Sequence, residues 1–349
     1  MELYLSHTSA LEHWRRVIDP TPFATYAYDL GDLGDLDARA HRNATRASAQ
    51  RAGRPDAADL ERLLLLGWLS HPVHLCVRDP SSRLRHPDVV CHTSSAKLPP
   101  QSFQRVHKGL YAACPELCFV QLAAQLPFVE LLEVGYELCG SYRLHREEFA
   151  IDPDSAGYDI FEAPALMTPS SLERFLDGAP GLWGAQTARR ALPHLLPGSA
   201  SPMETKLALL LCLPGSLGGY GLPKPQLNHR IDINERSQEA TSKAYLRGDL
   251  CWPESDLVVE YDSTAFHTGA THIAESAERS NALNDNDKDP FVVTNAQLHS
   301  VEKMNVLAKQ IAGKLGVRLR TRSKHWPQSQ TALREQLLRY DRVPGTPAR

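Results

Sequence analysis

The chain has 349 residues, of which 42% are hydrophobic and 23% charged, and its formal net charge is -3 at pH 7. This length suits two domains, and the composition is that of ordinary globular cores. The nearly balanced charge excludes a global basic field that would attract nucleic acid, so a nucleic-acid site must be a local patch.

The seven cysteines include no CxxC pair. An odd number without paired spacing favours reduced thiols in a cytoplasmic protein and argues against a zinc site. The opening residues, MELYLSHTSALEHW, lack the basic region and long apolar run of a secretory signal, so we expect none there. The apolar run LLLLGWL at 63–69 is far too short to span a membrane. We therefore expect no membrane partner.

The first part of the chain predicts short helices and strands. The segment DARAHRNATRASAQRAGR at 37–54 combines good helix formers with scattered arginines, and is either a solvated surface helix or one that faces nucleic acid. Asp56 is a suitable N-cap for a helix through Leu69. From Val73, short strands are predicted in VHLCV, DVVCHTS and FQRVHKGLYAA. The helix ELCFVQLAAQLPFVELLEVGYELCG follows, kinked or broken at Pro127.

Three histidines, His74, His92 and His107, are scattered through these predicted strands. A histidine at such a position is more often a polar strand residue than a metal ligand. We therefore assign no role to any of the three.

The order of predicted elements indicates an α/β protein with two main parts. Residues 150–165 predict a loop, and helices are predicted at Ser170–Asp177 and Ala185–Leu195. Farther along, the order helix, three strands, helix, strand, helix describes one compact α/β unit. We divide the chain into an N-terminal α+β recognition or regulatory region at 1–165, a helical connector at 166–197, the α/β unit at 198–325, and a C-terminal helix and tail at 326–349.

A predicted β-hairpin gathers three acidic residues. Asp249 lies near the end of one strand, and after a turn at Pro253–Ser255 a second strand covers Asp256–Tyr261. Glu260 and Asp262 are two residues apart at its end, which places them on one face. Because like charges repel, such a cluster calls for a cation or a shared proton. The alternative is a solvated hairpin end with ordinary surface acids.

A fourth acidic residue lies near the start of a helix that is predicted before the hairpin. The segment SPMETKLALLLCLP predicts a helix that begins near Ser201, with Pro202 in its first turn. Glu204 is the charged exception near the start of an otherwise apolar helix. It either belongs to the acidic cluster or only complements the helix N-terminus.

Four motifs in a fixed order carry a family resemblance. They are Ser201-Pro202-x-Glu204, Arg247-x-Asp249-Leu250-x-Trp252-Pro253, Glu260-Tyr261-Asp262 with His267, and Arg279 with Leu283. Together they resemble the PD-(D/E)XK nuclease superfamily, and most closely its very-short-patch-repair-like branch. The resemblance covers about 198–322. It implies a restriction-endonuclease-like mixed sheet flanked by helices.

The resemblance also implies an activity, a metal-dependent endonuclease that cleaves nucleic acid, expected to be DNA, in phage defence or repair. It implies that Asp249, Glu260 and Asp262 bind Mg²⁺ or Mn²⁺ and that Glu204 takes part in catalysis. The superfamily has Lys where this chain has Asp262, although the very-short-patch-repair branch also dispenses with that Lys. His267 is the candidate general base in its place, because imidazole titrates near neutral pH. The alternative is a surface histidine after the strand.

Several basic residues are candidates for contacts with phosphate. Arg247 and Arg279 could each bind a phosphate in a bidentate manner or pair with a nearby carboxylate. A basic stretch alternates as a strand would, and forms either a phosphate-tracking edge or a solvated edge strand protected by charge. Its residues are Arg318, Arg320, Arg322 and Lys324.

A weaker resemblance lies upstream. HLCV, VVCHTS and GLYAACPELCFVQLA resemble the abortive-infection antitoxin family of type IV toxin–antitoxin systems, although the N-terminal winged helix of that family is not evident. This resemblance implies a second hypothesis, a non-catalytic DNA-binding regulator with a degenerate nuclease domain. A third is a defence component that needs a partner protein from the same operon. The presence of Glu204, Asp249, Glu260 and Asp262 together favours the enzyme.

Overall fold

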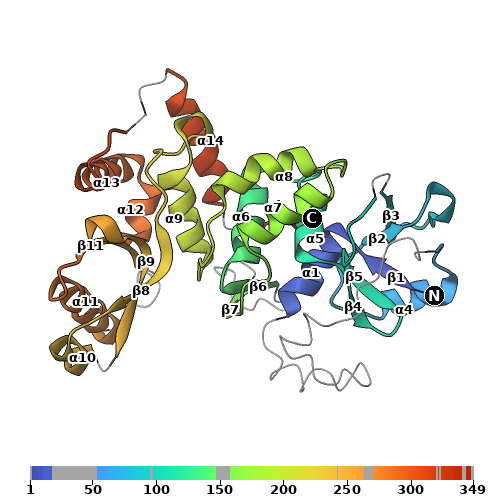
Figure 1. The fold of residues 1–349 in the computed structure, drawn as a ribbon, viewed down its shortest axis with the longest axis horizontal. Coiled ribbons are helices and arrows are strands. Elements are labelled where there is room, and N and C mark those ends of the chain that lie inside the picture. The colour runs from blue at the N-terminus through green and yellow to red at the C-terminus, as the bar shows by residue number, and fades with distance from the viewer. Residues whose placement is uncertain are drawn as a thin grey trace. The chain divides into compact units, whose positions relative to one another are not determined.

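The structure is a computed structural model that describes residues 2–17, 53–94, 97–146, 158–241, 243–262, 270–319, 321, 324–339 and 343–346. The chain forms two compact units (Figure 1). The first unit contains residues 1–195 and 340–349, and the second contains residues 196–339. Both combine sheets with helices, so the predicted α/β class is confirmed. Within the described residues, no helix has the length and apolar character needed to cross a membrane.

The first unit is built on a mixed five-stranded sheet in the order β3-β2-β1-β5-β4. Its strands are β1 (Leu3–Leu5), β2 (Val73–Val77), β3 (Val89–Thr93), β4 (Phe103–His107) and β5 (Leu110–Ala113). The pairs β1–β5 and β2–β3 are parallel, and β1–β2 and β4–β5 are antiparallel. The predicted strand FQRVHKGLYAA is therefore two strands, which turn at Gly109 with φ 77°.

One face of this sheet packs on an apolar cluster. Val73, Leu75 and Val89 contribute to it from alternate strand positions, together with Leu63 of α4 (Ala57–Leu64). As predicted, Asp56 caps α4, because its side chain accepts a hydrogen bond from the backbone N–H of Asp59 at 2.8 Å. The helix ends at Leu64, however, and not at Leu69.

Helices from the first unit also pack on its sheet. The helix α1 (His7–Arg16) contacts β2 and β5, and the Trp14 indole N–H donates to the Ala113 carbonyl at 2.8 Å. The predicted break at Pro127 is confirmed, because α5 (Pro115–Leu122) ends before it and α6 (Phe128–Cys139) begins after it.

The segment predicted as a loop at 150–165 contains a strand. β7 (Tyr158–Glu162) pairs antiparallel with β6 (Tyr142–Arg146), so this part of the prediction is wrong. The flanking Pro and Gly residues hid a short strand that depends on its partner. The region predicted as a connector, 166–197, carries α7 (Pro169–Gly178) and α8 (Ala185–Ala191) and belongs almost entirely to the first unit.

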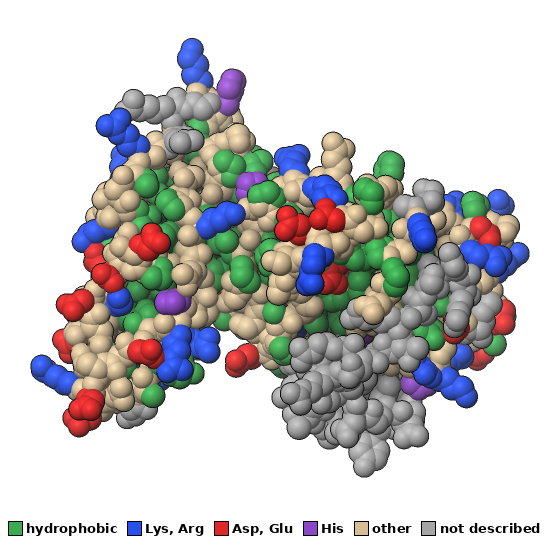
Figure 2. Space-filling model, in the orientation of Figure 1, with side chains coloured by type: hydrophobic (Ala, Val, Ile, Leu, Met, Phe, Trp, Pro, Cys, Tyr) green, Lys and Arg blue, Asp and Glu red, His purple; other side chains and the backbone are tan. Residues whose placement is uncertain are grey.

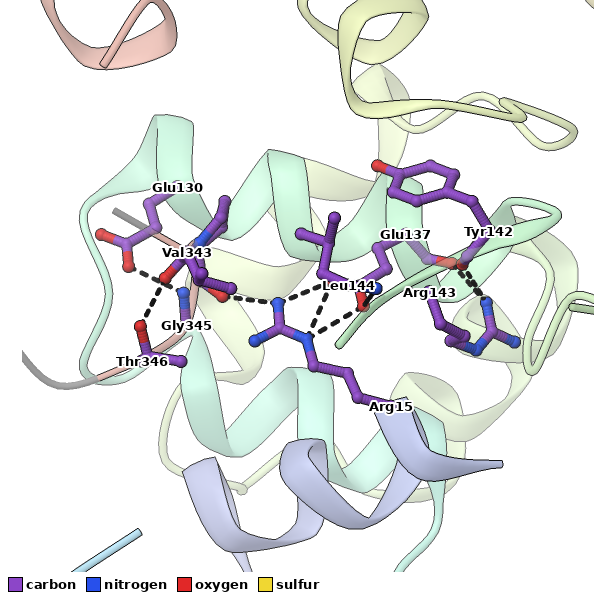
Figure 3. Close-up of polar contacts among 10 residues, drawn as sticks. Arg15, Glu130, Glu137, Tyr142, Arg143, Leu144, Val343, Gly345 and Thr346 are labelled. Atoms are coloured by element: carbon purple, nitrogen blue, oxygen red, sulfur yellow. Dashed lines mark hydrogen bonds and ion pairs between the residues drawn. The ribbon is translucent and has the colours of Figure 1, made fainter. Parts of the chain in front are cut away.

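A buried ion pair crosses the first unit (Figure 3). Arg15 of α1 binds Glu137 of α6 with two nitrogens, Nε to Oε1 at 2.9 Å and Nη2 to Oε2 at 2.7 Å. Glu137 also accepts the backbone N–H of Leu144 on β6 at 3.1 Å. A buried charge requires such complete pairing, since its desolvation is costly. The pair therefore fixes α1, α6 and β6 against one another.

The same cluster holds the end of the chain (Figure 3). Arg15 Nη2 donates to the Pro344 carbonyl at 2.6 Å, and the Gly345 N–H donates to Glu130 Oε1 at 2.8 Å. Residues 340–349 consequently belong to the first unit, although they follow the second in sequence. The segment 326–349 is therefore not one C-terminal element.

The second unit is built on a mixed four-stranded sheet in the order β11-β10-β9-β8. Its strands are β8 (Gln226–Asp232), β9 (Tyr245–Trp252), β10 (Leu257–Asp262) and β11 (Asp289–Thr294). The predicted hairpin is confirmed, because β9 and β10 are antiparallel around a turn at Pro253–Ser255. Leu257, Val258 and Val259 are each at most 1% exposed, so β10 is covered on both faces.

Helices surround this sheet (Figure 1). They are α9 (Pro202–Cys212), α10 (Glu235–Thr241), α11 (Ala270–Asn284), α12 (Asn295–His299), α13 (Val301–Lys314) and α14 (Trp326–Leu337). The predicted start of α9 is confirmed, with Ser201 as its N-cap. α11 connects the parallel strands β10 and β11, and its Ala282 and Leu283 pack with Val258 in one apolar cluster.

The predicted basic strand after α13 is not formed in the part of the chain that the structure describes there, residues 317–319, 321 and 324. The backbone N–H of Val317 instead donates to the Ala312 carbonyl at 2.9 Å, and Gly316 has φ 65°, so the helix ends in a left-handed turn. Arg318 and Lys324 are exposed. Alternation of charge is not sufficient for a strand, because a strand also needs a partner for its backbone hydrogen bonds.

The ion pair predicts a stability difference. Glu137→Gln keeps the side-chain shape but removes the carboxylate that pairs directly with the buried Arg15 guanidinium, and should destabilise the first unit by about 3–5 kcal/mol. Asp177→Asn breaks the exposed Arg189–Asp177 pair and should cost less than about 1 kcal/mol. Chemical denaturation followed by circular dichroism measures both. Equal small effects would contradict the assigned role of the buried pair.

Candidate active site

Asp249 is held at the point where the hairpin strands separate. The register between β9 and β10 runs from Leu257–Trp252 to Val259–Leu250. Just beyond it, the Asp249 Oδ2 atom accepts the backbone N–H of Tyr261 at 2.7 Å. The carboxylate thus takes the place of a ladder carbonyl, and its orientation is fixed by the sheet itself.

Glu260 lies on β10 next to Tyr261 and is only 8% exposed. Arg279 of α11 donates from Nε to Glu260 Oε1 at 2.7 Å, and the same guanidinium donates to the Arg247 carbonyl of β9. Of the two roles that the sequence left open for Arg279, the structure therefore has the pairing with a local carboxylate. This contact brings α11 to the strands that carry the acids.

Glu204 lies in the first turn of α9 and is 7% exposed. Its Oε2 atom accepts the backbone N–H of Ala200 at 2.9 Å and the side-chain amide of Asn228 at 2.5 Å. The Ser201 hydroxyl in turn accepts the Glu204 N–H at 3.2 Å. These donors are neutral, so they fix the position of the Glu204 carboxylate without supplying a positive charge.

Asn228 was missed in the sequence. It lies on β8 with φ 47°, a left-handed conformation that Asn adopts more readily than most residues. Besides Glu204, its amide donates to the Gly198 carbonyl at 2.9 Å. The one local feature that could have drawn attention to Asn228 is its amide side chain within a strand of otherwise alternating character.

The electrostatics of the site are unbalanced. Burial raises the pKa of Asp249 to about 8, and the neighbouring Glu204 and Glu260 carboxylates add to the rise. Burial also raises the pKa of Glu204, and it raises that of Glu260 against the opposing effect of Arg279. Among the described residues, three carboxyl groups thus share one guanidinium. Because these carboxyl groups repel one another, the site favours the uptake of a proton or of a cation.

The other predicted site residues have different environments. Asp262 is half-buried at the end of β10, opposite Thr294 of β11. Arg247 is exposed on β9, with its guanidinium 5.6 Å from the centre of the Tyr245 ring. His267, Arg320 and Arg322 lie outside the described residues.

The basic residues form no continuous stripe on the face shown in Figure 2. Among the side chains described there, Lys and Arg are interspersed with Asp and Glu. The acids themselves form an open arrangement, since no three of them within the described ranges have ligand atoms that all lie within 4.8 Å of one another. The structure therefore brings Glu204, Asp249 and Glu260 into electrostatic contact but not into a closed cage.

Comparisons with known proteins give no relative for this chain. No protein-family model matches it, and no match was found among curated proteins or among solved structures. A function for this chain therefore has to be inferred from its residues and their geometry.

The raised pKa of Asp249 predicts a pH-dependent effect of Asp249→Asn. Because the folded carboxyl titrates at about 8 instead of 3.8, its burial costs nothing below pH 3.8 and costs more as the pH rises toward 8. Asn carries no such cost and can still accept the Tyr261 N–H. In the presence of EDTA, the variant should therefore become more stable than the parent over this window, by about 1–3 kcal/mol at pH 8.

Asp256→Asn is the matched control, because Asp256 is an exposed acid in the turn of the same hairpin, paired with Lys288. Thermal unfolding between pH 5 and pH 8.5 provides the measurement. If the difference in stability between Asp249→Asn and the parent stays constant with pH, then the charged form of the Asp249 carboxyl group carries no cost of burial.

Proposed function

We propose that the second unit is a metal-dependent nuclease of the PD-(D/E)XK type that hydrolyses phosphodiester bonds in DNA. The observation that carries the proposal is the excess of buried carboxyl groups around Asp249 over the single guanidinium of Arg279. A site that serves only stability gains nothing from this repulsion, whereas a cation site requires it.

The donor set fits a hard divalent cation. The candidate ligand atoms are all carboxylate oxygens, which suit Mg²⁺ and Mn²⁺. Asp249, Glu260 and Asp262 would hold the ion, and Glu204 borders them. When bound, a divalent ion supplies Lewis-acid activation of water and charge neutralisation at the leaving oxygen.

The residues of the chain contribute positioning. The Tyr261 N–H orients the Asp249 carboxylate, and Asn228 orients Glu204. Arg279 holds Glu260 through its Nε atom. Because these groups are shielded from water, their electrostatic interactions are stronger than at an exposed surface. A proton acceptor for water is the remaining requirement, and His267 is our candidate for it.

The fold supports the proposal at a coarse level. A mixed sheet, preceded by α9 with its acid and joined across β10 and β11 by α11, is compatible with a restriction-endonuclease-like domain. We propose that classification together with the activity. A role in phage defence or repair, with a partner protein from the same operon, belongs to the same proposal.

One contact favours a second candidate function. The Arg279–Glu260 pair already gives one carboxylate a countercharge without any metal. A DNA-binding regulator with a degenerate nuclease domain would keep such a pair for stability. The two functions differ in whether the charge of Asp249 is needed.

Asp249→Asn should abolish cleavage if the site is catalytic. The substitution removes a charge that would hold the cation, so we expect a loss of about 100-fold or more in rate. DNA affinity should stay the same or rise, because one negative charge near the phosphates is gone. Plasmid, single-stranded DNA and RNA, each with Mg²⁺, Mn²⁺ or EDTA, are the substrates and conditions for the assay.

Asp256→Asn is again the control, since it makes the same chemical change outside the site and should cleave like the parent. Cleavage that is unaffected by EDTA would exclude the metal-dependent mechanism. Full biological activity of Asp249→Asn together with retained DNA binding would favour the regulator.

A further inference from the structure

A second group of potential ligands lies in the first unit. Among the described residues, a single set of three His, Cys, Asp or Glu side chains has ligand atoms that all lie within 4.8 Å of one another, and it consists of His7, His74 and His92. Nδ1 of His74 is 2.9 Å from Nε2 of His92, and the rings of His7 and His92 stack with centroids 3.7 Å apart. Three imidazoles from distant parts of the sequence therefore meet at one point.

The sheet register explains why two of them meet. In the parallel pair β2–β3, His74 lies opposite Val90 and His92 lies opposite Cys76. Val73, Leu75 and Val89, which alternate with them, face the apolar cluster that includes Leu63. His74 and His92 therefore project from the other face of the sheet.

His7 reaches the same point from the beginning of α1. Its backbone has φ 50°, which is uncommon for a residue other than Gly. The conformation is held by neighbours, because the His7 N–H donates to the Gln121 side chain at 3.0 Å and its Nδ1 lies 3.1 Å from the Ser6 hydroxyl. The Ser9 hydroxyl also accepts the backbone N–H of His74 at 2.9 Å, which joins α1 to β2. An unfavourable backbone that is retained by its surroundings is typical of a functional position.

The three rings are in the form that metals bind. Burial lowers the pKa of His92 to about 4, and it lowers the pKa of His7 and of His74 as well. Neutral imidazoles do not need to lose a proton before they coordinate a metal at pH 7. The simplest alternative is a purely structural cluster of stacked rings with one hydrogen bond between His74 and His92.

We propose that His7, His74 and His92 bind a divalent transition-metal ion of the zinc class. Tetrahedral coordination by imidazole nitrogens at about 2.0–2.1 Å places the ligand atoms roughly 3.3 Å apart. The His74 and His92 nitrogens, now 2.9 Å apart, need to separate only slightly to reach that geometry. A His7 ring nitrogen lies within 4.8 Å of both, and the His7 ring, which stacks on that of His92, turns to direct its lone pair at the same ion. Three protein ligands leave one coordination position for water or another small ligand. The group has imidazole ligands and no carboxylate. It therefore prefers a metal ion of the zinc class, whereas a magnesium site prefers carboxylate oxygens.

This inference differs from the expectation that the chain holds no zinc site. That expectation rested on the cysteine spacing, and it assigned no role to His74 and His92, because a strand histidine is more often a polar strand residue than a metal ligand. Their separation along the chain, with His7 on one side of a long segment and His74 and His92 on two strands, matches no short metal-binding motif. The three histidines come together only when β1, β2 and β3 pair in the sheet.

The test is a Co²⁺ titration of the metal-free, tag-free full chain carrying Asp249→Asn. That substitution weakens the other candidate cation site, and the assay uses no nuclease activity, so the outcome is independent of the proposed function. We expect one tightly bound Co²⁺ per chain with the intense visible absorption of tetrahedral coordination, displaced by one equivalent of Zn²⁺. Adding His92→Gln should weaken Co²⁺ affinity at least tenfold and remove this band.

His107→Gln in the same background is the matched control, because His107 is a half-buried strand histidine in the same sheet. It should bind Co²⁺ as before. Circular dichroism without metal checks that each variant is folded, and His74→Asn serves as the second ligand variant. A parent that shows no tetrahedral band, or ligand variants that keep it, would overturn the proposal and leave the structural cluster.

Discussion

The central constraint on the second unit is charge balance in a region shielded from water. Glu204, Asp249 and Glu260 meet one guanidinium, that of Arg279. In the first unit, by contrast, the buried Glu137 carboxylate is paired directly with the Arg15 guanidinium. Their remaining hydrogen-bonding capacity is met by backbone groups. By this contrast, the Arg15–Glu137 pair carries its own countercharge, whereas the acidic cluster leaves an excess of negative charge, which is the basis of the cation site that we propose.

The neutral contacts of the acidic cluster strengthen this interpretation. The Tyr261 N–H and the Asn228 amide orient the carboxylates without cancelling their charge. Preorganised groups of this kind reduce the reorganisation needed when a charged ligand arrives. Holding these carboxylates together makes the fold less stable when they are ionised and no cation is bound. Such a loss of stability is common at functional sites.

Local signals predicted the scaffold of the candidate site, and long-range pairing decided the rest. The cap at Ser201 and the turn at Pro253–Ser255 are encoded over a few residues, so α9 and the β9–β10 hairpin were found. β7 was missed because it exists through its pairing with β6. The partner of Arg279 could not be chosen from sequence, since both a phosphate and a carboxylate suit a guanidinium. The meeting of His7 with His74 and His92 depends on the order of three strands, which no local pattern specifies.

The two clusters differ in what they require when no metal is bound. Neutral imidazoles do not repel one another, and their stacking and the His74–His92 contact allow the histidine cluster to persist without a cation. Carboxylates do repel one another, so the acidic cluster must take up a proton instead. The pH dependence of stability near neutrality should therefore come mainly from the second unit, where the Asp249 pKa of about 8 lies in that range. Within the first unit, burial lowers the pKa of all three imidazoles, which favours their neutral form. The two cation sites that we propose would therefore use different ligands, carboxylates for a hard cation and imidazoles for a borderline one.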